Sequence, residues 1–394
     1  MELTALESVI CQHFGVCGGC RCASTPEGQS APPPYDQELA AKEAAVRDWL
    51  GPYPVDEWRP IIPSPDIWHY RNKMEYAIGG HPGVQIGLRE AGRFDLLVDV
   101  ETCFLMSPES VELIRRVRVW AKAKGLTGYH RRAHMGDLRY LVVREGKNTG
   151  QRMAVLITNK SIMPDSVGDL IPEIQPLLST CWLGRTDSQS DVARTEDMTL
   201  LWGSGSIEEK LGPLTFRVSP YSFFQTNTHG TERLYGLLDE WAVSLRGGAL
   251  LDLYCGSGGI TLSLASSFDR VVGIDTNKEA IQDGMYNAQQ NNLSNVEFVA
   301  TDAEEFLKKL PASKLSVQLS AVVVDPPRPG LHPKALKALL ELNPPHLGYV
   351  SCNPESLARD LQGLSPFYRI RTAQTVDLFP HTPHIETFVA LEHR

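Results

Sequence analysis

A thiol stands where a predicted strand meets a predicted helix, in the stretch GYVSCNPESLARDL (348–361). Cys352 follows a short apolar run, and the pattern after Asn-Pro is helical. Free cysteine is among the residue types most often buried as a small apolar group, which is the simpler interpretation. The carboxyl ends of strands in an α/β sheet, however, are also where ligands bind. Cys352 is therefore a candidate nucleophile, and the rest of the chain decides between the two.

Acidic side chains close three consecutive predicted strands upstream of this thiol. In LLDLYCGSGG a buried strand carries Asp252 and runs into a turn with Gly256 and two further glycines. The next two predicted strands end at Asp275 and near Asp302. Glycines at such a turn let the backbone approach a ligand closely, and an acid after the second strand is placed to bind ribose hydroxyls. The pattern predicts a nucleotide-type site.

The spacing of the glycines distinguishes two kinds of cofactor. A dinucleotide site needs G-x-G-x-x-G, so that a helix N-terminus receives the pyrophosphate. The turn here is C-G-S-G-G, preceded by an acid. A sulfonium cofactor without phosphate favours nearby acids over an anion cradle. The sequence therefore predicts S-adenosylmethionine.

The fourth predicted strand of this series ends in VVVDPPRPGL, at Asp325. Many methyltransferases hold an exocyclic amine with a DPPY or NPPY loop, but Arg328 occupies the aromatic position here. An arginine suits a phosphate or a base carbonyl, which disfavours amine methylation. A thiolate at Cys352 suits the methylation of carbon 5 of uracil instead. Its addition to carbon 6 turns carbon 5 into a nucleophile.

This chemistry also needs a base that removes the proton of carbon 5. Glu386 stands at the start of the apolar final strand, in FPHTPHIETFVALEHR, and is the candidate. A paired structural acid is the alternative interpretation. We further expect the helix start near Pro354 to lower the pKa of Cys352 through backbone N–H groups and the helix dipole.

Four of the eight cysteines crowd the first 22 residues, in CQHFGVCGGCRC. Cys11, Cys17 and Cys20 supply three thiolates on a glycine-rich loop, and either Cys22 or Cys103 completes a set of four. Four thiolates suit zinc or an iron–sulfur cluster, and their softness does not choose between them.

The elements that must position these residues follow two rhythms. Residues 1–220 show short alternating runs and predict an α+β domain with an antiparallel sheet. Residues 221–394 alternate helices and strands and predict an α/β, Rossmann-like domain with a doubly wound parallel sheet and a closing hairpin. A helix near 37–50 precedes the second domain in sequence but is expected to pack on it.

The totals bound the class of protein. The 394 residues carry a formal net charge of −9, with 42% hydrophobic and 22% charged residues, as in ordinary globular proteins. The charge argues against a generally cationic nucleic-acid coat. The sequence contains no signal peptide and no apolar run of membrane-spanning length, so we expect a cytoplasmic chain and no membrane partner.

Five stretches together resemble the RNA uracil-C5-methyltransferase family of the TrmA/RumA type: SFFQTN, DLYCGSGG, DPPRPG, SCNP and FPHTPHIET. The resemblance runs from Cys11 to the end of the chain and implies that Cys352 is the nucleophile and Glu386 the proton acceptor. It implies that the residues binding the cofactor, beside Gly256 of the turn, are Gln225, Tyr254, Asp275, Asp302 and Asp325. Asp325 is also a candidate contact of the uracil. The family usually has Phe at Tyr254 and Glu at Asp275, and both changes keep the chemistry.

The resemblance also bears on the cysteines and the substrate. Ribosomal-RNA members carry a [4Fe–4S] cluster on C-x5-C-x2-C and a distant cysteine, which implies Cys11, Cys17, Cys20 and Cys103 as ligands, with Cys22 spare. The stretch before Cys11 is too short for the N-terminal barrel of larger members, so the compact 23S rRNA members such as RlmC are the expected relatives. Radical S-adenosylmethionine enzymes are a further alternative. They carry a C-x3-C-x2-C motif on a barrel, however, whereas the spacing here is C-x5-C-x2-C.

The expected partner is 23S rRNA, free or partly assembled, bound by a monomer. Basic and aromatic residues in HYRNK (69–73), YHRRAH (129–134) and LRYLVVRE (138–145) are candidates for contacting RNA, although solvated strand edges would look the same. The target base must leave its stack to reach Cys352, with Phe223 or Phe224 near enough to stack on it. The alternatives are the same chemistry on tRNA, and a non-catalytic RNA-binding assembly factor that keeps the fold.

Overall fold

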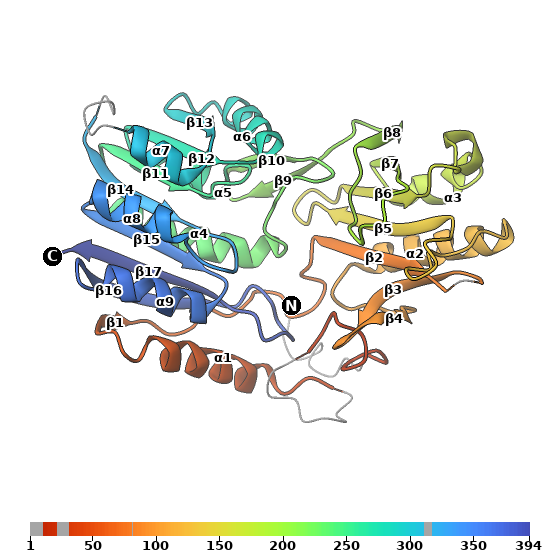
Figure 1. The fold of residues 1–394 in the computed structure, drawn as a ribbon, viewed down its shortest axis with the longest axis horizontal. Coiled ribbons are helices and arrows are strands. Elements are labelled where there is room, and N and C mark those ends of the chain that lie inside the picture. Colours follow the sequence, from red (N-terminus) through yellow and green to blue (C-terminus); the bar gives the residue numbers. More distant parts are fainter. Residues whose placement is uncertain (1–10, 22–30, 81, 311–316) are drawn as a thin grey trace.

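The computed structural model describes residues 11–21, 31–80, 82–310 and 317–394. Within these ranges the chain forms two large sheets, which lie side by side in Figure 1, and a two-stranded one. The larger sheet has the strand order β1-β16-β17-β15-β14-β11-β12-β13, and the smaller of the two has the order β4-β3-β2-β5-β6-β7-β8. The larger sheet contains the predicted strands of the C-terminal half.

The strands of the larger sheet are Val55–Trp58 (β1), Ala249–Leu253 (β11), Arg270–Asp275 (β12), Val296–Ala300 (β13), Leu319–Val324 (β14), His346–Ser351 (β15), Tyr368–Val376 (β16) and Glu386–His393 (β17). The helices around it are Tyr35–Leu50 (α1), Thr228–Val243 (α4), Gly259–Ser263 (α5), Lys278–Gln290 (α6), Ala303–Lys309 (α7), Pro333–Leu342 (α8) and Pro354–Leu364 (α9).

The seven-stranded sheet contains Lys73–Gly79 (β2), Gln85–Glu90 (β3), Arg93–Asp99 (β4), Leu138–Glu145 (β5), Arg152–Thr158 (β6), Thr180–Arg185 (β7) and Asp197–Trp202 (β8). Its helices are Pro108–Ala123 (α2) and Ile171–Ile174 (α3), and Ile207–Leu211 (β9) pairs with Leu214–Val218 (β10). Short 3₁₀ turns cover Pro164–Val167, Gln175–Leu177 and Ala265–Ser267.

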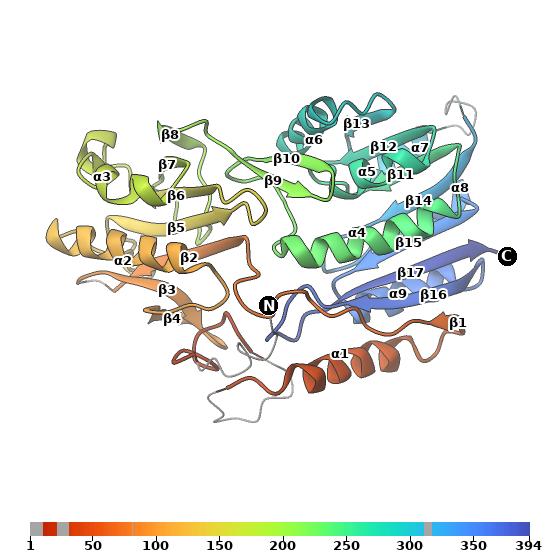
Figure 2. The same ribbon diagram turned by 180° about the vertical axis from the view of Figure 1, so that it is seen from behind.

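Both faces of the eight-stranded sheet are buried, because its central strands are apolar at successive positions. Leu251 and Leu253 pack in a core with α7, α8 and α9, whereas Leu250 packs on the opposite face with α4 and α5. Figure 1 shows α7, α8 and α9 in front of the sheet, and Figure 2 shows α4 in front of it from behind. Continuous apolar strands covered by helices on both sides are typical of parallel α/β sheets.

The last two strands form the predicted antiparallel pair, but they also extend the sheet. β17 lies between β15 and β16 and is antiparallel to both. This places Thr387 opposite Ser351, and Glu386 opposite Val376. The antiparallel β17 thus brings its first residue, Glu386, beside the end of β15, directly before Cys352.

Residues 35–58 lie on the C-terminal half of the molecule. Val46 and Leu50 of α1 are fully buried in the core that contains α9, and α1 runs beneath that half in Figure 1. β1, which the sequence pattern did not indicate, pairs in parallel with β16, with Val55 opposite Ile370. Residues 55–58 therefore share one sheet with the last two strands, and the boundary near residue 220 stays a prediction.

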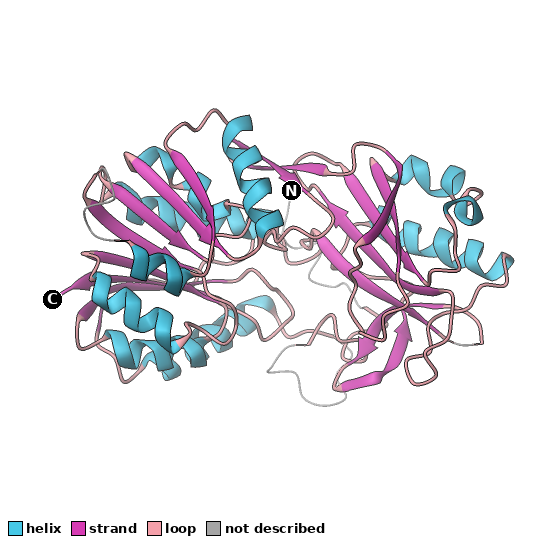
Figure 3. Cartoon of the chain, turned by 45° about the horizontal axis from the view of Figure 1, so that its top comes forward, coloured by secondary structure: helices cyan, strands magenta, loops and turns pink. Residues whose placement is uncertain are grey.

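The seven-stranded sheet is mixed rather than purely antiparallel, which corrects the expectation from the sequence. β6 and β7 are parallel, with Met153 opposite Thr180, while the other pairs are antiparallel. The connection between β6 and β7 carries α3 and two 3₁₀ turns, and a crossover of this length is what a parallel pair requires. Figure 3 shows the helices of this sheet gathered on its outer side.

None of the helices within the described ranges is both long enough and apolar enough for a membrane crossing.

Candidate active site

The carboxyl ends of four neighbouring parallel strands meet at one edge of the eight-stranded sheet. β11 pairs in parallel with β12 and with β14, and β14 pairs in parallel with β15. The segments that leave β11, β14 and β15 carry Gly256, Asp325 and Cys352, and β12 ends at Asp275. A ligand of such a sheet binds at this edge. The strand order thus gathers the predicted site residues from distant parts of the sequence.

The turn after β11 approaches its neighbours closely because it carries so few side chains. Gly256 and Gly258 have positive φ angles of 55° and 89°. A Cβ atom at Gly258 would lie 2.5 Å from Cζ of Phe298. The N–H of Gly256 donates to Oδ2 of Asp275 over 3.0 Å, which ties the turn to the end of β12. The result is a glycine edge that a cofactor can approach closely.

Tyr254 lies among the carboxylates at this edge. Burial, followed by the charges of Asp302, Asp360 and Asp275, raises the pKa of its phenol to about 12. Asp302 is exposed and caps α7, accepting the N–H of Glu304 over 2.8 Å, so it also has an ordinary structural role. Tyr254 therefore lies within electrostatic reach of both Asp275 and Asp302.

A fourth acid, Asp252, is completely buried under the turn. Burial, followed by Asp325 and Asp275, raises its pKa to about 8, although Thr261 Oγ1 donates to Oδ2 over 2.5 Å. Within the described residues Oδ1 has no hydrogen-bond partner. Tyr235 of α4 belongs to the same group, because Asp325 and Asp252 raise the pKa of its buried phenol. Nothing in the sequence pattern indicated Tyr235.

Gln225 links Asp325, at this edge of the eight-stranded sheet, to the N-terminal half of the chain. Its Nε2 donates to Oδ2 of Asp325 over 3.5 Å, and its main-chain oxygen accepts from Asn72 Nδ2 over 2.8 Å. The neighbouring Phe223 is 58% exposed, whereas Phe224 packs on Phe216 with ring centroids 5.7 Å apart. Of the two predicted stacking residues, only Phe223 presents its ring to solvent.

Cys352 lies between the end of β15 and the cap of α9, partly exposed. Burial raises the pKa of its thiol to about 11, and the charges of Glu386 and Asp325 act in the same direction. Arg328 acts in the opposite direction. The expectation of a lowered pKa is therefore wrong for the free protein: burial and two acids outweigh the helix start, where the N–H of Glu355 is already capped by the side chain of Asn353.

Glu386 is 3% exposed, and the charges of Asp325 and Arg328 act on it as they do on Cys352. Burial and then Asp325 raise its pKa well above the ordinary value, while Arg328 opposes the shift. Oε2 has no hydrogen-bond partner among the described residues. Burial also raises the pKa of Asp325, to about 7. Two carboxyl groups with raised pKa values and one thiol thus share a single electrostatic environment.

Of the two histidines near Glu386 in the sequence, only His384 lies near the thiol. Its Nε2 is 3.1 Å from Nη2 of Arg328, and burial followed by Arg328 lowers its pKa to about 4. His381 instead stacks on Trp68, with ring centroids 3.8 Å apart. His381 is thus held against Trp68 and does not line the cavity beside Cys352.

A cavity of about 320 Å³ opens beside the thiol. It is lined by Cys352, Arg328 and His384 and, from α1, by Lys42 and Trp49. Lys42 is nearly buried, with its Nζ 2.9 Å from Oδ1 of Asp377 and 2.7 Å from Oε1 of Glu38. The sequence pattern did not indicate Lys42 and Trp49, because only the packing of α1 on α9 brings them there.

The cysteine-rich loop packs against β3 of the seven-stranded sheet. The N–H of Gly18 donates to the main-chain oxygen of Arg89 over 2.7 Å, and a Cβ at Gly18 would lie 3.1 Å from that oxygen. A Cβ at Gly19 would lie 2.9 Å from Cδ1 of Leu88. The glycines of CGGC therefore let the loop lie directly on β3.

The four predicted ligand cysteines lie near one another. Burial raises the pKa values of Cys11, Cys17 and Cys20, and in each case the charge of Cys103 adds to the shift. Cys22 lies outside the described residues. The donor set fits a thiolate-bound cluster. Among the described residues, however, no three His, Cys, Asp or Glu side chains are already arranged to hold a metal ion, so the [4Fe–4S] ligand set stays a prediction.

Comparisons with known proteins identify the family of the chain. The family described as tRNA (uracil-5-)-methyltransferase matches residues 192–394. An uncharacterized RNA methyltransferase of Chlorobaculum tepidum is 34% identical, covering 97% of this chain and 82% of its own. One of Halalkalibacterium halodurans is 35% identical over the same shares.

A solved structure gives the same result. The tRNA (uracil-54, C5)-methyltransferase of Pyrococcus abyssi, in complex with S-adenosyl-L-homocysteine, superposes with a TM-score of 0.76 at 31% identity, covering 94% of this chain and 89% of its own. The eight-stranded sheet is thus an α/β S-adenosylmethionine-dependent methyltransferase fold, not the barrel of the radical alternative. The resemblance to the compact 23S rRNA members stays a prediction. The chain belongs to the RNA uracil-C5-methyltransferase family and is an S-adenosylmethionine-dependent RNA methyltransferase.

Proposed function

We propose that this chain forms 5-methyluridine in RNA, with Cys352 as the nucleophile and Glu386 as the base. The observation that carries the proposal is the common environment of Cys352, Glu386 and Asp325. Each of the two carboxylates raises the pKa of the thiol, and the cofactor edge begins at Gln225, 3.5 Å from Asp325. A thiol, a base and a methyl-donor site are what methylation at carbon 5 requires.

The proposed reaction begins at carbon 6 of the uracil and ends with release of the sulfur. Cys352 loses its thiol proton to solvent, and the thiolate sulfur forms a bond to carbon 6 of the uracil, which moves the electron pair of the double bond to carbon 5. When bound, S-adenosylmethionine would supply the methyl group to carbon 5 and leave as S-adenosylhomocysteine, whose sulfur keeps the electron pair of the broken sulfur–methyl bond. Glu386 then takes the proton of carbon 5, the double bond re-forms, and the sulfur leaves carbon 6. The raised pKa of Glu386 suits a base, because it makes the carboxylate a stronger proton acceptor.

Arg328 has a separate role in this scheme. It is the only side chain among the causes of the Cys352 shift that favours the thiolate. It also holds His384 at 3.1 Å, on the wall of the Cys352 cavity. We assign to Arg328 the role of stabilising the Cys352 thiolate until it adds to carbon 6 of the bound uracil.

For the cofactor, we assign the glycine edge and the side chains around it: Gln225, Tyr254, Gly256, Asp275, Asp302 and Asp325. Asp275 is oriented by the N–H of Gly256 and by the N–H of Asn277, over 3.0 and 2.8 Å. Its carboxylate is thus held rigidly at the end of β12, the place where ribose hydroxyls are bound in such folds.

For the RNA, 23S rRNA remains the expected substrate from the resemblance, bound by a monomer as free or partly assembled RNA. The cysteine set supports it, because we assign a [4Fe–4S] cluster to Cys11, Cys17, Cys20 and Cys103. The Pyrococcus abyssi enzyme, which acts on tRNA, makes tRNA the second candidate.

The test uses the purified full-length chain with S-adenosylmethionine labelled in its methyl group. Total rRNA and tRNA from a strain lacking the enzyme serve as separate substrates, and nucleosides are identified by mass spectrometry. We expect labelled 5-methyluridine in rRNA, none with Cys352→Ala, and product with the control Cys181→Ala, whose buried thiol belongs to the core of the other half. Label confined to tRNA would replace the rRNA assignment, and label on an amine would overturn the mechanism.

A further inference from the structure

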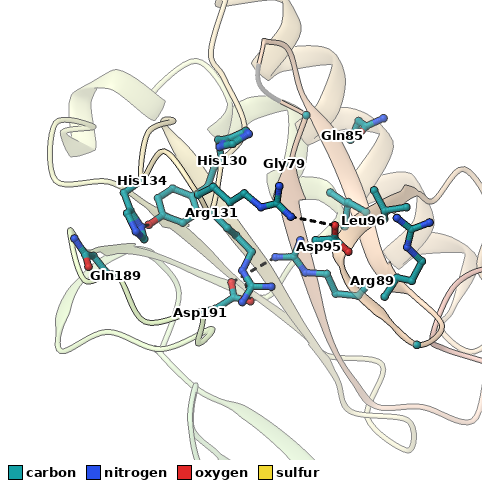
Figure 4. A pocket seen from close by; sticks show the side chains of 16 residues that line it. Gly79, Gln85, Arg89, Asp95, Leu96, His130, Arg131, His134, Gln189 and Asp191 are labelled. Carbon is teal, nitrogen blue, oxygen red and sulfur yellow. Dashed lines mark hydrogen bonds and ion pairs between the residues drawn. The ribbon is translucent and has the colours of Figure 1, made fainter.

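A second cavity, of about 890 Å³, lies on the seven-stranded sheet, and its lining includes neither Cys352 nor any proposed cofactor residue. Four arginines line it: Arg89, Arg93, Arg131 and Arg132. We call it the arginine cavity. Figure 4 shows Arg89 and Arg131 reaching toward Asp191 from different elements. β2, β3, β4 and the segment after Gly128 form its walls.

The charge of this cavity contrasts with that of the whole chain. Its four arginines face two aspartates, whereas the chain has a net charge of −9. Arg131 Nε lies 3.1 Å and Arg89 Nη2 3.4 Å from oxygens of Asp191, while Arg132 Nη2 lies 3.5 Å from Asp95. Because two aspartates face four arginines, the lining of the cavity carries a net positive charge. Such a site attracts phosphate groups.

Aromatic and imidazole groups add a second kind of contact. Tyr129 lines the cavity, with the guanidinium of Arg139 4.0 Å from its ring centroid and its hydroxyl 3.0 Å from Nδ1 of His134. His130 and His134 also line the cavity. Arginines combined with a fixed aromatic ring are the groups that contact single-stranded nucleic acid, through its phosphates and its bases.

The wall that carries these residues is held firmly on the sheet. A Cβ at Gly128 would lie 1.9 Å from the main-chain oxygen of Gly79, so only glycine allows this approach. The N–H of Tyr129 donates to the main-chain oxygen of Ile78 over 3.1 Å, and His130 bridges to Met135. The arginines at 131 and 132 thus extend from a turn anchored on β2.

We propose that the arginine cavity binds a segment of the RNA substrate away from the target uridine. This inference rests on the proposed function. Asn72, directly before β2, contacts Gln225 at the cofactor edge, whereas Gly79 at the far end of β2 lines the cavity. Seven residues of strand span roughly 20 Å. At 3.4 Å per stacked nucleotide, about six nucleotides separate the two places.

The test measures RNA affinity as a function of salt for the double variant Arg93→Ala/Arg132→Ala. Both side chains are exposed, so the fold is expected to tolerate their removal. The matched control is Arg115→Ala, because Arg115 is exposed on α2, which packs on the other face of the sheet. The thermal midpoint of each variant confirms that it is folded.

Each phosphate contact contributes about 0.7 to the slope of log K against log salt for single strands. Loss of two contacts should lower the slope by about 1.4, which corresponds to binding about 25-fold weaker at 0.1 M relative to 1 M salt. The difference from wild type should shrink as the RNA is shortened below about six nucleotides from the target uridine.

Two results separate this proposal from the proposed function. If the wild type methylates uridine at carbon 5 but the double variant keeps the slope and affinity of the Arg115→Ala control on long RNA, the arginine cavity is not an RNA site. If the slope falls as expected but the wild type forms no 5-methyluridine, the cavity assignment holds and the proposed reaction fails.

Discussion

Alkylation of Cys352 in the RNA-free enzyme should follow the ionisation of a group with a pKa of about 11. Burial is the main cause, and the charges of Glu386 and Asp325 add to it. Glu386→Gln removes one of these charges and should lower the pKa toward the ordinary value of 9.0. Arg328→Gln removes the charge that opposes them and should raise it.

The size of the effect on reactivity follows from the same values. At pH 8 a thiol with a pKa of about 11 is ionised in about one molecule in a thousand, against about one in ten at a pKa of 9.0. Only the thiolate reacts with iodoacetamide at an appreciable rate. The wild-type thiol should therefore react about a hundredfold more slowly at pH 8 than an unperturbed cysteine, and its rate should rise about tenfold per pH unit up to pH 10.

The assay follows the rate at the Cys352 peptide by mass spectrometry, because the chain has seven other cysteines. Arg369→Gln is the matched control, since this arginine is exposed and pairs with Asp56. It should titrate as the wild type does. A wild-type rate that levels off below pH 9, or a Glu386→Gln profile that coincides with the wild type, would refute the electrostatic coupling of thiol and base.

Three further changes test the surroundings of the site. Asp252 keeps its proton up to about pH 8 in the folded protein but releases it near pH 4 in the unfolded chain, so wild-type stability should fall as the pH rises between these values. The thermal midpoint of Asp252→Asn should therefore rise relative to that of the wild type from pH 5 to pH 8. A difference in midpoint that does not change with pH would contradict the raised pKa of Asp252. Gly258→Ala should cost at least about 1 kcal/mol in urea unfolding and weaken S-adenosylhomocysteine binding in calorimetry, because its φ is 89° and its Cβ would meet Phe298; unaltered binding would remove the turn from the cofactor site. Lys42→Met leaves both Asp377 and Glu38 buried without their cation and should cost about 3 kcal/mol, part of which Lys42→Met/Asp377→Asn should restore by removing one of the two charges; equal losses in both variants would show that the Lys42–Asp377 pair is not the cause.

The sequence was a good guide where a residue's position follows from strand order. Asp275, Asp325 and Cys352 end or follow apolar runs, and parallel strands place their carboxyl ends at one edge. Glu386 reached the same edge because the closing pair of strands is antiparallel. Local patterning was sufficient in these cases, since each residue follows or begins a strand that could be recognised by its composition.

The sequence was a poor guide where the contact is long-range. Lys42 and Trp49 reach the Cys352 cavity only because α1 packs on α9, and β1 joins a strand more than 300 residues later in the chain. No periodicity encodes such a partner. The sign of the Cys352 shift was also wrong, because the helix start visible in the sequence competes with burial and with Glu386, whose distance from the thiol only the fold determines.

The most direct test of the central claim incubates Glu386→Gln protein with RNA and S-adenosylmethionine and then measures the intact mass of the protein under denaturing conditions. We expect a covalent complex of protein, RNA and one added methyl group, because the sulfur of Cys352 stays on carbon 6 when no base removes the proton of carbon 5. The complex should be absent from Cys352→Ala/Glu386→Gln. Release of 5-methyluridine-containing RNA by Glu386→Gln at the wild-type rate, with no covalent complex, would contradict the account.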